Sequence, residues 1–157
     1  NGFYNSPRQQ RTFEVRKCGR EYWRKFRKYH YLNSDINQST QCYGLYLGNE
    51  IIGFCGVIHQ PNKDKTLKRV TRLVILPDYQ GIGLGTRFLE IIAETYKRKG
   101  NNITIVTSAK NLIKSLKNNS KWVLIRYSAN NTSNSIEALN KTTRTNCKTA
   151  SFFYKGE

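Results

Sequence analysis

The sequence lacks methionine, has few acidic residues and contains no long apolar run. Its 157 residues include no Met, 10 Asp and Glu together, and only 3 Pro. No stretch reaches the roughly 18 apolar residues that a membrane-spanning helix needs, so we expect nothing to span a membrane. No basic segment followed by an apolar one opens the chain, so we expect a cytoplasmic rather than a secreted protein. Because even position 1 is not Met, we expect a processed chain or a piece of a longer protein.

The four cysteines, Cys18, Cys42, Cys55 and Cys147, are widely spaced. No pair has the two-residue spacing that is typical of zinc sites and redox motifs. We therefore expect reduced thiols and no bound metal. The length fits one ordinary domain. We expect a flexible arm over residues 1–10 and a single domain over residues 11–157.

A positive net charge is the strongest feature of the composition. Lys and Arg number 27, so the formal net charge is +17. Such an excess attracts polyanions, which makes DNA or RNA a candidate partner. The alternative is a solvated basic surface in a protein from an AT-rich genome, whose codons favour Lys, Asn, Ile and Tyr. Charge alone does not decide between the two.

Hydrophobic periodicity predicts alternating strands and helices. Helices are expected over 20–32, 85–99 and 111–117, and strands over 11–18, 42–47, 51–59, 70–76, 102–107, 122–127 and 149–154. Residues 128–148 form a long polar excursion. This order predicts an α/β (α+β) fold, in which helices flank a central mixed sheet.

A glycine-rich turn connects the strand over 70–76 to the helix over 85–99. Its sequence is Gln80-Gly81-Ile82-Gly83-Leu84-Gly85. Helix N-termini have unpaired N–H groups and a positive dipole end, and glycines let a ligand approach the backbone closely. The turn therefore predicts a phosphate-binding site. It is not a Walker loop, because no Gly-Lys-Ser/Thr follows, and its spacing does not fit a dinucleotide fingerprint.

Gln80-x-x-Gly83-x-Gly85 resembles the Gln/Arg-x-x-Gly-x-Gly/Ala signature of the GNAT superfamily, the Gcn5-related N-acetyltransferases. The order of elements resembles the GNAT fold over about residues 11–157. The resemblance implies a central, mostly antiparallel sheet and an acyl-CoA-dependent N-acyltransferase that uses acetyl-CoA. Segments 23–32, 72–81 and 150–154 also resemble GNAT domains of mobile elements and of archaeal ATPase fusions. A more distant resemblance is to the phage DNA-modification protein Mom.

The resemblance also implies which residues bind the coenzyme. In the family, the pantetheine arm lies beside the strand before the turn, and amides of the turn hold the pyrophosphate. A backbone N–H near Leu76 is expected to stabilise the oxyanion. Asn111 is expected either to contact the coenzyme or to cap the helix that it opens. The expected coenzyme-binding residues are Leu73, Ile75, Leu76, Gln80, Gly81, Ile82, Gly83, Leu84, Gly85, Thr86 and Asn111.

The catalytic residues are less well indicated. Many relatives carry a Glu early in the strand before the turn, but this chain has Lys68-Arg69-Val70-Thr71-Arg72 there. His59 and His30 are the main candidates for the general base, because histidine titrates near neutral pH. Asp78 and Glu50 are weaker candidates. Many relatives place a tyrosine that acts as the general acid after the last helix, but this chain has Leu116 and Lys117 there. Tyr127, Tyr154 or solvent would then donate the proton.

Three functions stay open at this stage. The first is transfer to an amine, with nucleic acid or a nucleic-acid-associated molecule as acceptor. The second is modification of a nucleic-acid base on the same scaffold, and the third is a binding module without catalysis. An aromatic stripe over 22–29 adds a further choice, since it fits either a buried helix face or a platform on which bases stack.

Overall fold

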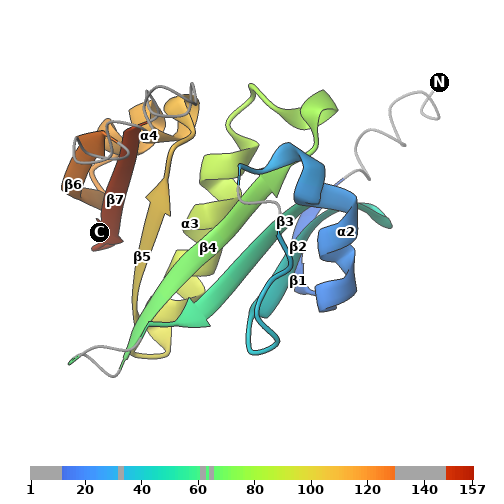
Figure 1. The fold of residues 1–157 in the computed structure, drawn as a ribbon, viewed down its shortest axis with the longest axis horizontal. Helices are drawn as coiled ribbons and strands as arrows, with labels where there is room; N and C mark the ends of the chain where they lie inside the picture. The colour runs from blue at the N-terminus through green and yellow to red at the C-terminus, as the bar shows by residue number, and fades with distance from the viewer. Residues whose placement is uncertain (1–11, 32–33, 61–62, 64–65, 130–147) are drawn as a thin grey trace, which may run out of the picture.

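The computed structural model describes residues 12–31, 34–60, 63, 66–129 and 148–157. The predicted arm over 1–10, residue Cys147 and most of the polar excursion lie outside these residues. The described chain forms one sheet of seven strands, which are β1 Phe13–Lys17, β2 Gln41–Leu47, β3 Glu50–His59, β4 Leu67–Ile75, β5 Asn102–Thr107, β6 Trp122–Ala129 and β7 Lys148–Tyr154. They lie in the order β1-β2-β3-β4-β5-β7-β6. Figure 1 shows α3, Leu84–Arg98, on one side of this sheet and α2, Trp23–Phe26, on the other. No helix in the described part is long and apolar enough to cross a membrane.

Every predicted strand is confirmed, with ends that differ by three residues at most. Neighbouring strands are antiparallel except β4 and β5, which are parallel, so the predicted mixed, mostly antiparallel sheet is confirmed.

Helix α3, Leu84–Arg98, covers one face of the sheet. Its apolar stripe is buried in full, with Phe88 and Leu89 excluded from solvent. These side chains pack with apolar residues of the sheet such as Ile52 and Ile105. Burying one such side chain stabilises a fold by about 1.5–3 kcal/mol, so this layer is the main source of stability. The stripe consists of Phe88, Leu89, Ile92, Ala93 and Tyr96.

The opposite face carries a shorter layer, and here one prediction is wrong. In place of a continuous helix over 20–32, the chain forms η2 Arg20–Tyr22, α2 Trp23–Phe26 and η3 Arg27–Tyr29. The indole Nε1 of Trp23 donates to the carbonyl of Ser34 at 2.8 Å, which requires the chain to turn back. Tertiary contacts therefore override the local helical pattern.

The aromatic stripe of this segment is only half buried. Trp23 and Phe26 pack on Phe54, with ring centroids 5.4 and 5.8 Å away. Tyr22 and Tyr29 are exposed by 39% and 42%. The expectation of a buried face therefore holds for Trp23 and Phe26 and is wrong for the two tyrosines.

The third helix, α4 Lys110–Lys117, follows β5. Ala109 is its N-cap, so the alternative that Asn111 caps this helix is wrong. The hydroxyl of Thr107 accepts from the Ala109 N–H at 3.1 Å and fixes the entry of the chain into the helix. Ile113 and Leu116 are buried beneath it.

Candidate active site

Strands β4 and β5 are paired at one end and separate at the other. They pair in parallel only from Leu67 with Asn102 to Val70 with Ile105. Beyond Val70, β4 continues beside β3, while β5 pairs with β7. Figure 1 shows the two strands diverging towards the end of β4 that leads to the turn. The sheet therefore has a V-shaped opening with its apex at Val70.

The backbone of β4 presents hydrogen-bonding groups to this opening. The N–H of Leu76 donates to the carbonyl of Ile52 at 2.9 Å, on the β3 side. Successive residues of a strand direct their N–H groups to opposite sides, so those of Leu73 and Ile75 point towards the opening. This arrangement suits the arm-binding role expected for Leu73 and Ile75. The Leu76 N–H is already bonded, so the oxyanion role expected for an N–H near Leu76 falls to that of Ile75 and stays a prediction.

The glycine-rich turn lies at the wide end of the opening. After η4, Pro77–Tyr79, the backbone passes through Gly81 and Gly83 with φ of 87° and 83°, values that other residues rarely adopt. Apart from the glycine itself and its chain neighbours, no atom of the described residues lies within 4 Å of the place where a Cβ on either glycine would stand. Gly83 caps α3, whose first N–H groups have no partner within the helix. The turn is an open cradle of amides at a positive helix end.

Two side chains hold this cradle in place. The Gln80 side-chain nitrogen donates to the carbonyl of Ile75 at 2.7 Å, which ties the turn back to the end of β4. The hydroxyls of Thr86 and Ser115 are 2.9 Å apart and join the start of α3 to α4. These bonds give Gln80 and Thr86 a role in positioning the turn. The side chain of Asn111 is exposed on the first turn of α4.

A β-bulge lies at the apex of the opening. The pairing of β3 with β4 shifts between Gly56 with Arg72 and Val57 with Val70, so Thr71 is an extra residue. In a regular strand, Val70 and Arg72 would point to the same face of the sheet. Because of the extra residue, Val70 points towards α3 and Arg72 points towards α2. Bulges often re-aim side chains beside active sites.

Arg72 is a site residue that the sequence did not single out. Its side chain is only 9% exposed, and its guanidinium lies 5.4 Å from the ring of Trp23. Burial lowers the pKa of this guanidinium. The available signal was a charged residue directly before the apolar run of Leu73, Val74 and Ile75. We name Trp23, His30, Tyr31, Thr40 and Arg72 the Arg72 cluster.

The structure separates the residues expected to be catalytic. His30 belongs to the Arg72 cluster, with its ring 5.8 Å from Trp23 and stacked on Tyr31 at 4.7 Å. His59 is exposed and pairs with Lys68, at the end where β4 and β5 are joined. Among the predicted bases, His30 is therefore the one that lies on the α2 face beside Trp23 and Arg72.

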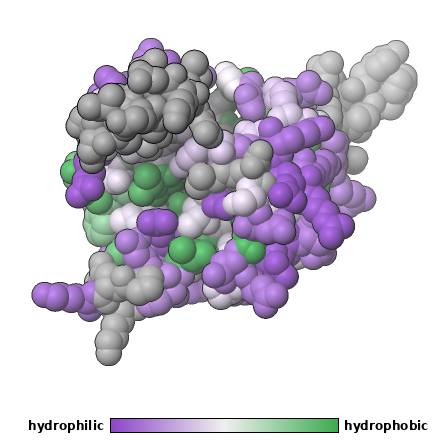
Figure 2. Space-filling view, viewed as in Figure 1, coloured by the Kyte–Doolittle hydropathy of each residue, from purple (hydrophilic) through white to green (hydrophobic). Residues whose placement is uncertain are grey.

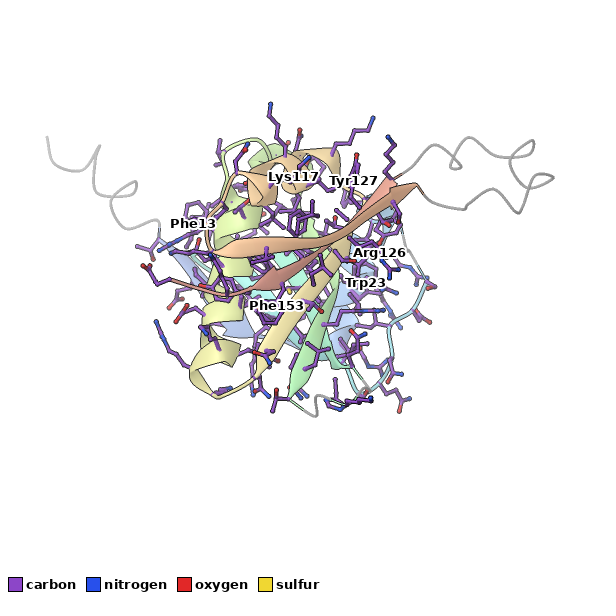
Figure 3. All side chains as sticks on the ribbon, turned by 90° about the vertical axis from the view of Figure 1, so that its left-hand side faces the viewer. Phe13, Trp23, Lys117, Arg126, Tyr127 and Phe153 are labelled. Carbon is purple, nitrogen blue, oxygen red and sulfur yellow. The ribbon has the colours of Figure 1, made fainter. Side chains whose placement is uncertain are left out.

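The other proton-transfer candidates lie apart from this cluster. Tyr127, on β6, is 49% exposed and is flanked by the amines of Lys117 and Lys148, 5.4 and 5.7 Å from its ring (Figure 3). Tyr154 donates to Glu94 at 2.7 Å on the α3 side. Asp78 lies in η4 and Glu50 opens β3, and both side chains are exposed.

A basic surface surrounds Tyr127. A cavity of about 250 Å³ lies between α4 and β6 and is lined by Lys110, Ile113, Lys114, Lys117, Asn118 and Tyr127. Exposed apolar side chains continue along β6 at Val123, Leu124 and Ile125. Figure 2 shows apolar surface on the side of β5 to β7 and a hydrophilic surface over α2. Within the described residues, no group of three or more His, Cys, Asp or Glu is placed to hold a metal ion.

Comparison with known proteins agrees with this geometry. No curated protein sequence matches the chain significantly. Among solved structures, a Bacillus subtilis acetyltransferase in complex with CoA has 13% identity and a TM-score of 0.66, with 92% of this chain and 98% of that one covered. The ribosomal-protein-S18-alanine N-acetyltransferase of Escherichia coli has 13% identity and a TM-score of 0.66, with coverage of 91% and 93%.

A third structure, a GNAT family acetyltransferase from Elizabethkingia anophelis with acetyl-CoA bound, has 12% identity and a TM-score of 0.58, with coverage of 92% and 98%. At such identities these structures share the fold with this chain. The sequence itself matches the family described as acetyltransferase (GNAT) domain over residues 8–116, which is more than half of the chain. The chain therefore belongs to the GNAT family of acetyltransferases.

Proposed function

We propose that the chain binds acetyl-CoA in the opening between β4 and β5 and transfers the acetyl group to an amine. The amides of Gly81 to Thr86 would hold the pyrophosphate at the helix end. The N–H groups of Leu73 and Ile75 would pair with the pantetheine arm. The CoA and acetyl-CoA in two of the related structures support this choice of coenzyme. The separation of β4 from β5 beside an open cradle is the observation that carries the proposal.

The reaction is a direct transfer. The amine nitrogen attacks the thioester carbonyl, an N–C bond forms and the C–S bond breaks. The nitrogen loses a proton to a base, and the leaving thiolate takes up a proton. Because the pyrophosphate lies at the wide end of the opening, the thioester reaches towards its apex. Since α3 covers one face, the amine approaches from the α2 face.

His30 is the base that this geometry favours. Its ring lies in the Arg72 cluster on the α2 face, whereas His59 is exposed at the joined end of the strands. A correctly placed base accelerates such reactions about 100- to 10,000-fold. Tyr127 lies among lysines on β6, which favours a role in binding rather than in proton transfer.

The test is acetyl transfer from radiolabelled acetyl-CoA to fractions of a cell extract. Separate fractions of nucleic acid, protein and small amines are incubated with the wild-type chain and with Gly83→Trp. We expect label in one fraction with the wild type and none with the variant, whose indole would fill the cradle. Equal labelling by both proteins would refute coenzyme binding at the turn.

We further propose that a nucleic acid, or a molecule bound to one, is the acceptor. The supporting observation is the cavity beside α4, where Tyr127 stands among lysines that suit phosphates while its ring suits stacking on a base.

The thiols of Cys18, Cys42 and Cys55 are free, which suits a reducing compartment such as the cytoplasm.

Salt dependence tests the nucleic-acid proposal. The logarithm of the affinity falls linearly with the logarithm of the salt concentration. Replacing Lys110, Lys114 and Lys117 by Gln should make this slope shallower by about 2 to 3, because each phosphate contact contributes about 0.7–0.9. The matched control replaces the exposed Lys17, Lys97 and Lys155. Equal loss of slope in both triple variants would indicate non-specific attraction to the whole basic surface and count against this site.

A further inference from the structure

Arg72 is a buried cation with no acidic partner among the described residues. Its Nη1 donates to the carbonyl of Thr71 at 3.1 Å, and its Nε meets no acceptor in the described part of the chain. Burial lowers the pKa of the guanidinium, because desolvation disfavours the charged form. Leaving a buried charge without an anion is costly, so a fold that retains one at its active site needs a reason.

Thr40 provides a second unpaired group next to Arg72. Its side chain is 8% exposed, and its hydroxyl has no hydrogen-bond partner in the described structure. Both side chains lie over Gly56, since a Cβ there would stand 3.0 Å from Thr40 Cγ2 and 3.6 Å from Arg72 Cβ. A hydroxyl and a guanidinium can donate to the same oxygen-bearing anion.

The position of this pair relates it to the acceptor. Arg72 follows the bulge at the apex of the opening and faces α2, the side from which an amine would approach. Tyr31, half exposed, marks the solvent edge of the cluster. The charges of Arg72 and Arg69 act to lower the pKa of the Tyr31 hydroxyl against the effect of burial, so its phenol lies near both. An anion entering beside Tyr31 would meet the positive charges of Arg72 and Arg69.

We propose that Arg72 and Thr40 bind an oxyanion, a carboxylate or a phosphate, that the acceptor carries near its amine. The anion neutralises the buried charge and fixes the amine at the apex of the opening. Arg72 takes no part in the bond changes. The identity of the bound molecule as acceptor rests on the proposed acetyl transfer, whereas oxyanion binding itself does not.

Binding is tested on the full chain saturated with CoA, so that the cradle is occupied. Acetate and inorganic phosphate are titrated in turn at constant ionic strength, while the side-chain Nε–H signals of the arginines are followed by NMR. We expect the Arg72 signal, assigned by its loss in Arg72→Met, to move and to saturate. Arg98, which pairs with Glu94 at the surface, is the control signal and should move little.

Transfer is tested with three small amines by release of CoA thiol. β-Alanine carries a carboxylate, phosphoethanolamine carries a phosphate, and ethanolamine carries no anionic group. An anionic amine should have a KM at least about tenfold below that of ethanolamine, the effect of one charge-assisted hydrogen bond. The KM values of β-alanine and phosphoethanolamine show whether a carboxylate or a phosphate is preferred. In Arg72→Met this ratio of KM values should collapse towards one, and in Arg98→Met it should persist.

Stability separates binding from a structural role. Replacing an unpaired buried charge by a similar apolar side chain should leave the melting temperature of Arg72→Met unchanged or higher. An Arg72 signal that ignores both anions, together with a lower melting temperature, would overturn the proposal. If the Arg72 signal responds but no amine is acetylated, the oxyanion site is upheld. In that case only the proposed acetyl transfer to these small amines is contradicted.

Discussion

The two faces of the sheet differ in how they are built. On the α3 face, a long helix buries a regular apolar stripe and its start forms an open cradle with the turn. On the α2 face, three short helical pieces cover an arginine without an acidic partner in the described structure. The first face therefore offers backbone amides to a ligand, and the second holds a buried side-chain charge. The comparison teaches that one sheet presents different chemistry on its two faces.

The largest expected effect concerns the cradle. Gly83→Trp should weaken CoA binding about 1000-fold, because it removes about two hydrogen bonds to charged phosphate, each contributing roughly 2 kcal/mol. Gly48→Trp is the matched control, since Gly48 also has a positive φ, 62°, with open space around it. Isothermal titration calorimetry measures both affinities. Equal losses in the two variants would show that backbone strain alone is responsible and would break the comparison.

The next effect concerns the acceptor face. His30→Ala should lower kcat about 100-fold with the acceptor found by labelling, whereas His59→Ala should change it by less than about twofold. The reason is placement, because only His30 lies among Trp23, Tyr31 and Arg72. Steady-state kinetics over a range of pH measures both variants. The acid limb of the rate profile should vanish in His30→Ala, and its persistence would assign the proton transfer to solvent.

The smallest effect concerns the thiol of Cys18, at the edge of the α2 face. Burial raises its pKa from 9.0 to about 12. The unfolded chain ionises first, so the stabilisation is intact below pH 9 and is lost as pH rises from 9 towards 12. Cys18→Ala should therefore reduce the fall in melting temperature between pH 8 and pH 10.5 by about 2–4 °C. Parallel curves for variant and wild type would contradict the assigned burial.

Much of the fold followed from local patterns. The stripe of α3 at three- and four-residue steps predicted both the helix and its buried side. The predicted helix over 20–32 failed, because the packing of Trp23 and its bond to Ser34 outweighed local preference. The β-bulge at Thr71 could not be predicted from the sequence either, because a bulge depends on how two strands pair.

The sequence by itself determined the strand, turn and helix that form the cradle, because glycines and apolar periodicity act within a few residues of one another. It also showed that the usual carboxylate is absent from the strand before the turn. Only the tertiary structure decided which N–H groups of β4 face β3 and that His30, Thr40 and Arg72 share one face with Trp23. Their meeting depends on pairing and packing between segments far apart in the chain, and no local pattern records such contacts.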